Sequence, residues 1–116
     1  MNNIYYINKI LIVTFALCFA NHHLYSAEEK KFLILGDSIS AGYGVDGDSQ
    51  WTKILQKKIQ GSNWKIINAS ISGDTTGGGL SRVSALIKKH KPSILLIELG
   101  GNDALRGYPT EKIKSN

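Results

Sequence analysis

The stretch Phe32-Leu33-Ile34-Leu35-Gly36-Asp37-Ser38 decides the fold. Consecutive apolar residues that end at a glycine are typical of a β-strand buried on both faces. Two later runs, 64–69 and 93–99, have the same character. Apolar residues recur at helical spacing in the intervening segments 51–59 and 80–87. The predicted order is therefore strand, helix, strand, helix, strand.

This alternation predicts an α/β fold with a parallel sheet, right-handed crossovers and helices on its faces. Segment 36–47 is expected to be a Gly-rich loop, and Asp48 or Ser49 to cap the first helix. The second predicted helix begins with three glycines, 77–79. Each glycine lowers helix stability by up to about 1 kcal/mol, so their presence indicates that the backbone closely approaches another part of the fold there. A last helix is expected from a Thr110 cap.

The composition narrows the classes of function. The chain has 116 residues, 42% hydrophobic and 20% charged, which fits one small globular domain. Fourteen Lys and Arg against nine Asp and Glu give a net charge of +5. These basic residues are scattered without interleaved aromatics, so no nucleic-acid partner is predicted. There is no Walker A sequence and no His/Cys/carboxylate cluster, so neither a cofactor nor a metal is predicted.

Residues 1–27 are interpreted as a secretory signal peptide, which leaves 28–116 as the folded part. Lys9 precedes an apolar run, 10–20, that covers about half of the ~20 residues a membrane-spanning helix needs, so no stable membrane anchor is expected. Cleavage after Ala27 or within the apolar run remains open. Cys18 is assigned to this signal peptide.

Ser38 lies on a loop at the carboxyl end of the first predicted strand, the edge where such sheets bind ligands. A hydroxyl on such a turn can attack an acyl carbon if a base takes its proton and donors stabilise the oxyanion. The Ser38 amide, the Gly73 amide and the Asn102 side chain come from three different strand-end loops. Each motif alone is common in turns, but their order and register together indicate a catalytic site.

Three blocks carry a family resemblance: 36–44 (GDSISAGYG), 68–76 (NASISGDTT) and 100–103 (GGND). They resemble the first three conserved blocks of the GDSL or SGNH hydrolases, and look most like the periplasmic acyl-thioesterase, arylesterase and lysophospholipase group. The resemblance covers residues 32–109. It implies a three-layer flavodoxin-like fold, of which 28–116 is the N-terminal β-α-β-α-β part, a small ester or thioester substrate, and export to the periplasm.

The resemblance also assigns roles by position. Ser38 resembles the nucleophile, and Gly73 and Asn102 resemble the oxyanion-hole donors. Asp37 and Asp103 resemble residues that orient the loops through hydrogen bonds and take no part in proton transfer.

The family's fourth block, a carboxyl-terminal Asp-x-x-His that supplies the general base, has no match in this sequence. His22 and His23 fall in the predicted leader. His90 ends the second predicted helix, at the amino end of the sheet and ~16 to 20 Å from Ser38, whereas a base must reach within about 3 Å. The sequence therefore predicts a truncated domain whose third strand exposes an edge.

Three hypotheses remain open. In the first, the chain is the N-terminal part of an exported serine esterase or thioesterase. In the second, it is a catalytically inactive truncated or split-gene product that either unfolds or needs a complementing C-terminal fragment. The third is a dinucleotide site, because residues 42–47 satisfy G-x-G-x-x-G. That motif begins six residues beyond Gly36, however, and lacks an acid at the end of the second strand.

Overall fold

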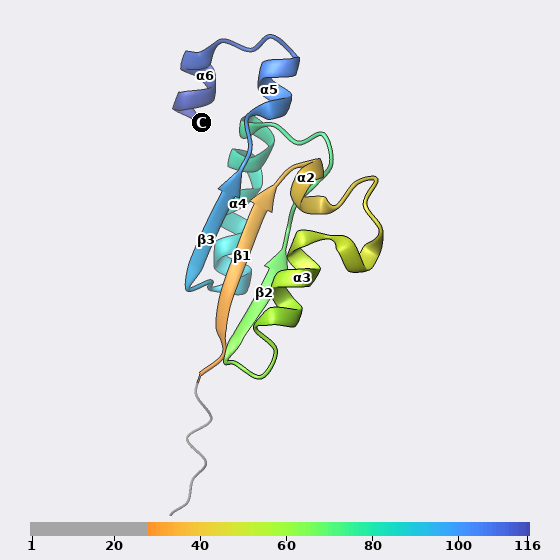
Figure 1. Cartoon of the computed structure of the whole chain (residues 1–116). Helices are drawn as coiled ribbons and strands as arrows, with labels where there is room; N and C mark the ends of the chain where they lie inside the picture. Colours follow the sequence, from red (N-terminus) through yellow and green to blue (C-terminus); the bar gives the residue numbers. More distant parts are fainter. Residues whose placement is uncertain (1–27) are drawn as a thin grey trace, which may run out of the picture.

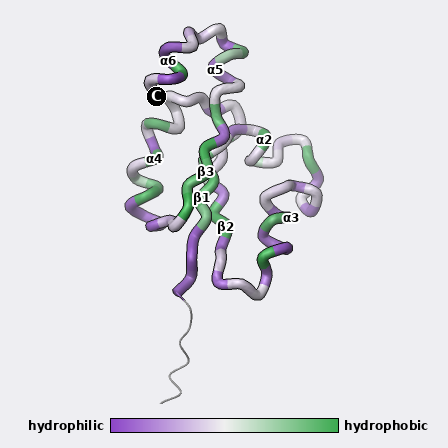
Figure 2. Tube along the Cα trace, turned by 60° about the vertical axis from the view of Figure 1, so that its left-hand side comes forward, coloured by the Kyte–Doolittle hydropathy of each residue, from purple (hydrophilic) through white to green (hydrophobic). Residues whose placement is uncertain are grey.

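A computed structural model describes residues 28–116, and the predicted signal peptide lies outside the described residues. It contains one parallel sheet with the strand order β2-β1-β3. The sheet and its two long helices are β1 (Lys30–Gly36), α3 (Trp51–Lys58), β2 (Trp64–Asn68), α4 (Thr76–His90) and β3 (Ile94–Glu98). Figures 1 and 2 show α3 and α4 on opposite faces of the sheet. The predicted three-layer α/β architecture is confirmed.

The core is centred on β1. Leu33 and Ile34 are fully buried and Leu35 is 2% exposed. Because β1 has a strand on each side and a helix over each face, its side chains are buried whichever way they point, as the continuous apolar run predicted. β3 lies at the edge of the sheet, and its Ile97 is 60% exposed. Figure 2 shows the hydrophobic residues concentrated in the strands.

The glycines at the start of α4 allow the helix to pack closely on its surroundings. Thr75 caps the helix, and its hydroxyl accepts a hydrogen bond from Gly78 N at 3.2 Å. A Cβ atom at Gly79 would lie 2.3 Å from Leu99 Cδ1, so no larger residue fits without a shift. The close approach predicted from the sequence is therefore observed at Gly79.

The loops contain more helix than predicted. The segment expected to be only a loop contains α2 (Ser38–Ala41), and a second short helix, α5 (Gly101–Leu105), follows β3. The expected cap by Asp48 or Ser49 is wrong: both residues lie in the 3₁₀ turn η1 (Gly47–Ser49). Asp48 instead pairs with Lys57, with the carboxylate oxygen 3.0 Å from Nζ.

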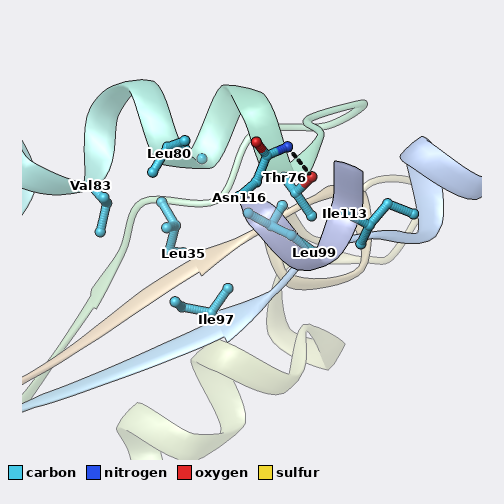
Figure 3. A pocket seen from close by; sticks show the side chains of 9 residues that line it. Leu35, Thr76, Leu80, Val83, Ile97, Leu99, Ile113 and Asn116 are labelled. Carbon is cyan, nitrogen blue, oxygen red and sulfur yellow. Dashed lines mark hydrogen bonds between the residues drawn. The ribbon is translucent and has the colours of Figure 1, made fainter. Parts of the chain in front are cut away.

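The carboxyl-terminal helix α6 (Thr110–Ser115) also differs in its start. Pro109 occupies the cap position and Thr110 is the first helical residue. An apolar hollow of about 180 Å³ lies between α4, β3 and α6. Figure 3 shows the side chains that line it. Its aliphatic lining consists of Leu35, Leu80, Val83, Ile97, Leu99 and Ile113. Within residues 28–116, no helix has the length and hydropathy of a membrane span.

Candidate active site

Three loops leave the carboxyl ends of the strands and meet at one edge of the sheet (Figure 1). They carry Ser38 after β1, Gly73 after β2 and Asn102 after β3. Asn102 Nδ2 donates a hydrogen bond to Asp37 Oδ2 at 3.0 Å. Ile71 N donates to Gly36 O, also at 3.0 Å. The turn that holds Ser38 is therefore bonded to both other loops.

Asp37 organises the Ser38 turn from a position that is only 4% exposed. Its Oδ1 accepts a hydrogen bond from Ile39 N at 3.0 Å and so caps α2. Gly42 ends this single helical turn with φ of 79°, a left-handed conformation that favours glycine. Ser38 is the first residue of α2 and half-buried, and neither its hydroxyl nor its N–H has a hydrogen-bond partner among the described residues.

Glu98, the last residue of β3, also forms hydrogen bonds to the turn that holds Ser38. Its Oε2 accepts hydrogen bonds from Ser40 Oγ at 2.9 Å and from Asp37 N at 3.4 Å. A Cβ atom at Gly36 would lie 2.9 Å from the same oxygen. Glu98 was not predicted from the sequence as a site residue, although a carboxylate at the end of an apolar strand signals a need for hydrogen-bond donors.

Gly73 lies in a tight turn between Ile71 and Asp74. Asp74 N donates to Ile71 O at 3.0 Å, and Gly73 has φ of 79°, as the third residue of a type II turn requires. Arg106 Nη2 donates to Gly73 O at 3.0 Å. Among residues 28–116 the Gly73 N–H has no partner, so it is available to a ligand at the sheet edge.

Asp103 is 1% exposed and joins the third loop to the start of α4. Its oxygens accept hydrogen bonds from Thr76 N at 2.9 Å and Thr76 Oγ1 at 2.6 Å. Asn116 Nδ2 donates in turn to Thr76 Oγ1 at 2.9 Å (Figure 3). Desolvation raises the pKa of Asp103, but the hydrogen bonds from Thr76 and the charge of Arg106 outweigh it and leave the pKa below its ordinary value of 3.8.

The lowered pKa of Asp103 predicts a pH-dependent contribution to stability. The contribution is full above the pKa of the unfolded chain, about 3.9, and is lost as the pH falls through the lower pKa of the folded state. We expect the difference in melting temperature between the unmodified protein and Asp103→Asn to narrow as the pH falls from about 5 towards 2. Asp48→Asn, at an exposed carboxylate, is the matched control. A constant difference over this range would contradict the prediction.

His90 does not belong to the site. It is the last residue of α4, beside the amino ends of the strands, whereas Ser38 follows the carboxyl end of β1. His22 and His23 lie outside the described residues. Residues 42–47 follow α2 and do not connect a strand directly to a helix, so they lack the placement of a dinucleotide fingerprint. No group of three or more metal-ligating side chains occurs within 28–116.

Fold and site together define a parallel α/β protein with a serine-centred polar site at the strand ends. Residues 34–116 match the model of the GDSL-like Lipase/Acylhydrolase family. The chain belongs to this family.

Individual relatives are similar over the same part of the chain. Esterase TesA of Pseudomonas aeruginosa is 46% identical over 92 residues, which are 78% of this chain and 46% of the relative. Thioesterase 1/protease 1/lysophospholipase L1 of Escherichia coli is 48% identical over 87 residues, 75% of this chain and 41% of the relative. The chain thus spans about half the length of the curated relatives it matches.

Solved structures agree with this assignment. A crystal structure of TesA superposes with a TM-score of 0.71 at 45% identity, covering 74% of this chain and 49% of that one. AlinE4, an SGNH-hydrolase family esterase, gives a TM-score of 0.68 at 38% identity, covering 76% and 49%.

Proposed function

We propose that residues 28–116 provide the nucleophile and the oxyanion hole of a serine hydrolase that acts on carboxylic esters or acyl thioesters. The observation that carries this proposal is the double role of Asp37. One of its oxygens caps the helical turn that begins at Ser38, and the other holds the Asn102 side-chain amide at 3.0 Å. A single buried carboxylate thus ties a candidate nucleophile to a candidate oxyanion donor.

In the proposed reaction, Ser38 Oγ attacks the acyl carbon as its proton passes to a base, and the carbonyl electron pair moves onto the oxygen. We assign the Ser38 N–H, the Gly73 N–H and the second N–H of the Asn102 side-chain amide as the donors to that oxyanion. Collapse of the intermediate expels the alkoxide or thiolate, which takes up the proton. Water then hydrolyses the acyl-enzyme by the same steps.

The general base of this scheme is proposed to come from outside residues 28–116. His90, the one histidine of that range, lies at the far end of the sheet. The family resemblance implies an Asp-x-x-His pair, supplied by further residues of a longer polypeptide or by a separate carboxyl-terminal fragment. Without the pair, only the residual acceleration of an oxyanion hole and binding site is expected, ~10³ to 10⁴ over water. The isolated chain would then be nearly inactive.

The proposal is tested by hydrolysis of short p-nitrophenyl esters together with covalent labelling by a phosphonate ester, located by mass spectrometry. A phosphonate is an apt probe because the similar psychrotrophic esterase EstA of Pseudoalteromonas, 48% identical, has been solved inhibited by monoethylphosphonate. We expect the label on Ser38 and a loss of hydrolysis in step with labelling. Hydrolysis that survives complete labelling of Ser38 would contradict the proposal.

The proposal includes both esters and thioesters because similar proteins carry the names esterase, arylesterase and thioesterase. It also includes export to the periplasm, which rests on the leader-like pattern of residues 1–27. Cell fractionation tests the export, and a protein retained with its first residues intact in the cytosol would contradict it.

A further inference from the structure

We propose that Arg82 is a positioning residue that holds the Gly73 loop in the geometry an oxyanion hole requires. This inference rests on the proposed function. Arg82 lies in the second turn of α4, and its side-chain hydrogen bonds go to Asp74 and Ala69 of the Gly73 loop, so we expect any effect on catalysis to pass through this loop.

The Arg82 guanidinium bonds both ends of the loop that carries Gly73. At the carboxyl end of the loop, Nε and Nη2 donate to Asp74 Oδ2 at 3.0 and 2.6 Å. At the amino end, Nη1 donates to the carbonyl oxygen of Ala69. One rigid planar group therefore sets the separation between the points where the loop begins and ends.

The pair is partly shielded from solvent. The side chains of Arg82 and Asp74 are 21% and 12% exposed, whereas those of the surface pair Lys57 and Asp48 are 62% and 86% exposed. Exposed pairs contribute little to stability because water and salt screen them. Losing one partner of a shielded pair leaves the other charge without compensation, so the loop would rearrange after removal of Arg82.

Other contacts hold the amino end of this loop on β1, where Ala69 N donates to Ile34 O at 2.9 Å and Ile71 N donates to Gly36 O at 3.0 Å. The exposed Arg106 bonds to Gly73 O. At the carboxyl end, Asp74 is held by the Arg82 guanidinium and by the one backbone hydrogen bond of the turn, from Asp74 N to Ile71 O. A displacement of about 1 Å in a catalytic group can cost ~10²-fold in rate. The position of the Gly73 N–H is therefore expected to depend on Arg82.

The test compares Arg82→Ala, Arg82→Lys and the surface control Lys57→Ala in a protein whose Asp-x-x-His pair is supplied by fusion to the carboxyl-terminal half of the Pseudomonas aeruginosa esterase. The first readout is amide hydrogen exchange. We expect Arg82→Ala to speed exchange in residues 70–74 by about tenfold or more, while Leu33–Leu35 in β1 stay protected as in the unmodified protein. The exchange rate of residues 70–74 in Arg82→Lys should lie between those of Arg82→Ala and the unmodified protein, because lysine keeps the positive charge but lacks the several N–H donors of the planar guanidinium.

The second readout is the split between kcat and KM on p-nitrophenyl esters. We expect kcat to fall about 10- to 100-fold in Arg82→Ala with KM within about twofold, because the oxyanion hole acts in the transition state. Added ethylguanidine should restore part of the loss. Unchanged exchange in 70–74, or faster exchange spread across β1, would overturn the inference, as would an unchanged kcat in an active protein.

The two proposals fail in distinguishable ways. If the protein supplied with an Asp-x-x-His pair does not hydrolyse esters, the proposed function fails, and the exchange of residues 70–74 still decides whether Arg82 holds the loop. If hydrolysis depends on Ser38 but kcat is indifferent to Arg82, only the positioning role is overturned.

Discussion

Ser38→Ala is expected to lower ester hydrolysis by a factor of about 10⁴ to 10⁶ when an Asp-x-x-His pair is present, and to change it little when the pair is absent. Nucleophile and base act as one unit in serine hydrolases, so removing either costs about as much as removing both. The size of the Ser38 effect therefore reports whether a base reaches the strand ends. It tests the nucleophile and the origin of the base in one experiment.

The measurement uses residues 28–116 alone and the same residues fused to the carboxyl-terminal half of the Pseudomonas aeruginosa esterase, the half that the match does not span. Each is prepared unmodified, as Ser38→Ala and as the control Ser49→Ala. Ser49 is exposed in η1 and should tolerate the change. A fused, folded Ser38→Ala protein that hydrolyses esters at the unmodified rate would rule out Ser38 as the nucleophile.

The long elements of the fold were predictable because each one expresses a local pattern. The apolar run before Gly36 is buried on both faces, as such runs are in parallel sheets. The short helices α2 and α5 were not predicted because a single turn has no periodicity and is unstable alone. α2 depends on the Asp37 cap, and Asp37 is itself held by Asn102 and Glu98 from β3 and the loop that follows it.

The candidate site was likewise predictable only in part from the sequence. The locations of Ser38, Gly73 and Asn102 followed from strand ends and motifs, and the structure places all three at one sheet edge. Glu98 and Arg82 were missed because their partners lie in other elements. Arg82 reads as one polar residue of an amphipathic helix until the loop 69–74 is folded against it. Supporting residues of this kind depend on tertiary contacts that spacing does not reveal.

Asn102→Ala is expected to lower kcat by about 10² to 10³ with little change in KM, since removing one oxyanion-hole donor typically has this effect. Its amide nitrogen already donates to Asp37 Oδ2, which leaves the second N–H for the substrate oxygen. The loss should therefore appear in the transition state and not in substrate binding. Steady-state kinetics of the fused protein on a p-nitrophenyl ester measure both constants.

The substitution also removes a partner of Asp37, so the kinetic effect must be separated from damage to the Ser38 turn. Asn63→Ala is the matched control: its Nδ2 donates to Glu28 O at 3.2 Å, at the opposite end of the sheet. A phosphonate probe reports the turn itself, because labelling requires a nucleophilic Ser38 in its native position. If KM rises and kcat is unchanged, Asn102 binds substrate in the ground state and is not an oxyanion donor. If instead kcat falls and KM is preserved, with Ser38 still accepting the label at a reduced rate, the donor role is supported, because the phosphonyl oxygen relies on the same hole as the ester oxyanion.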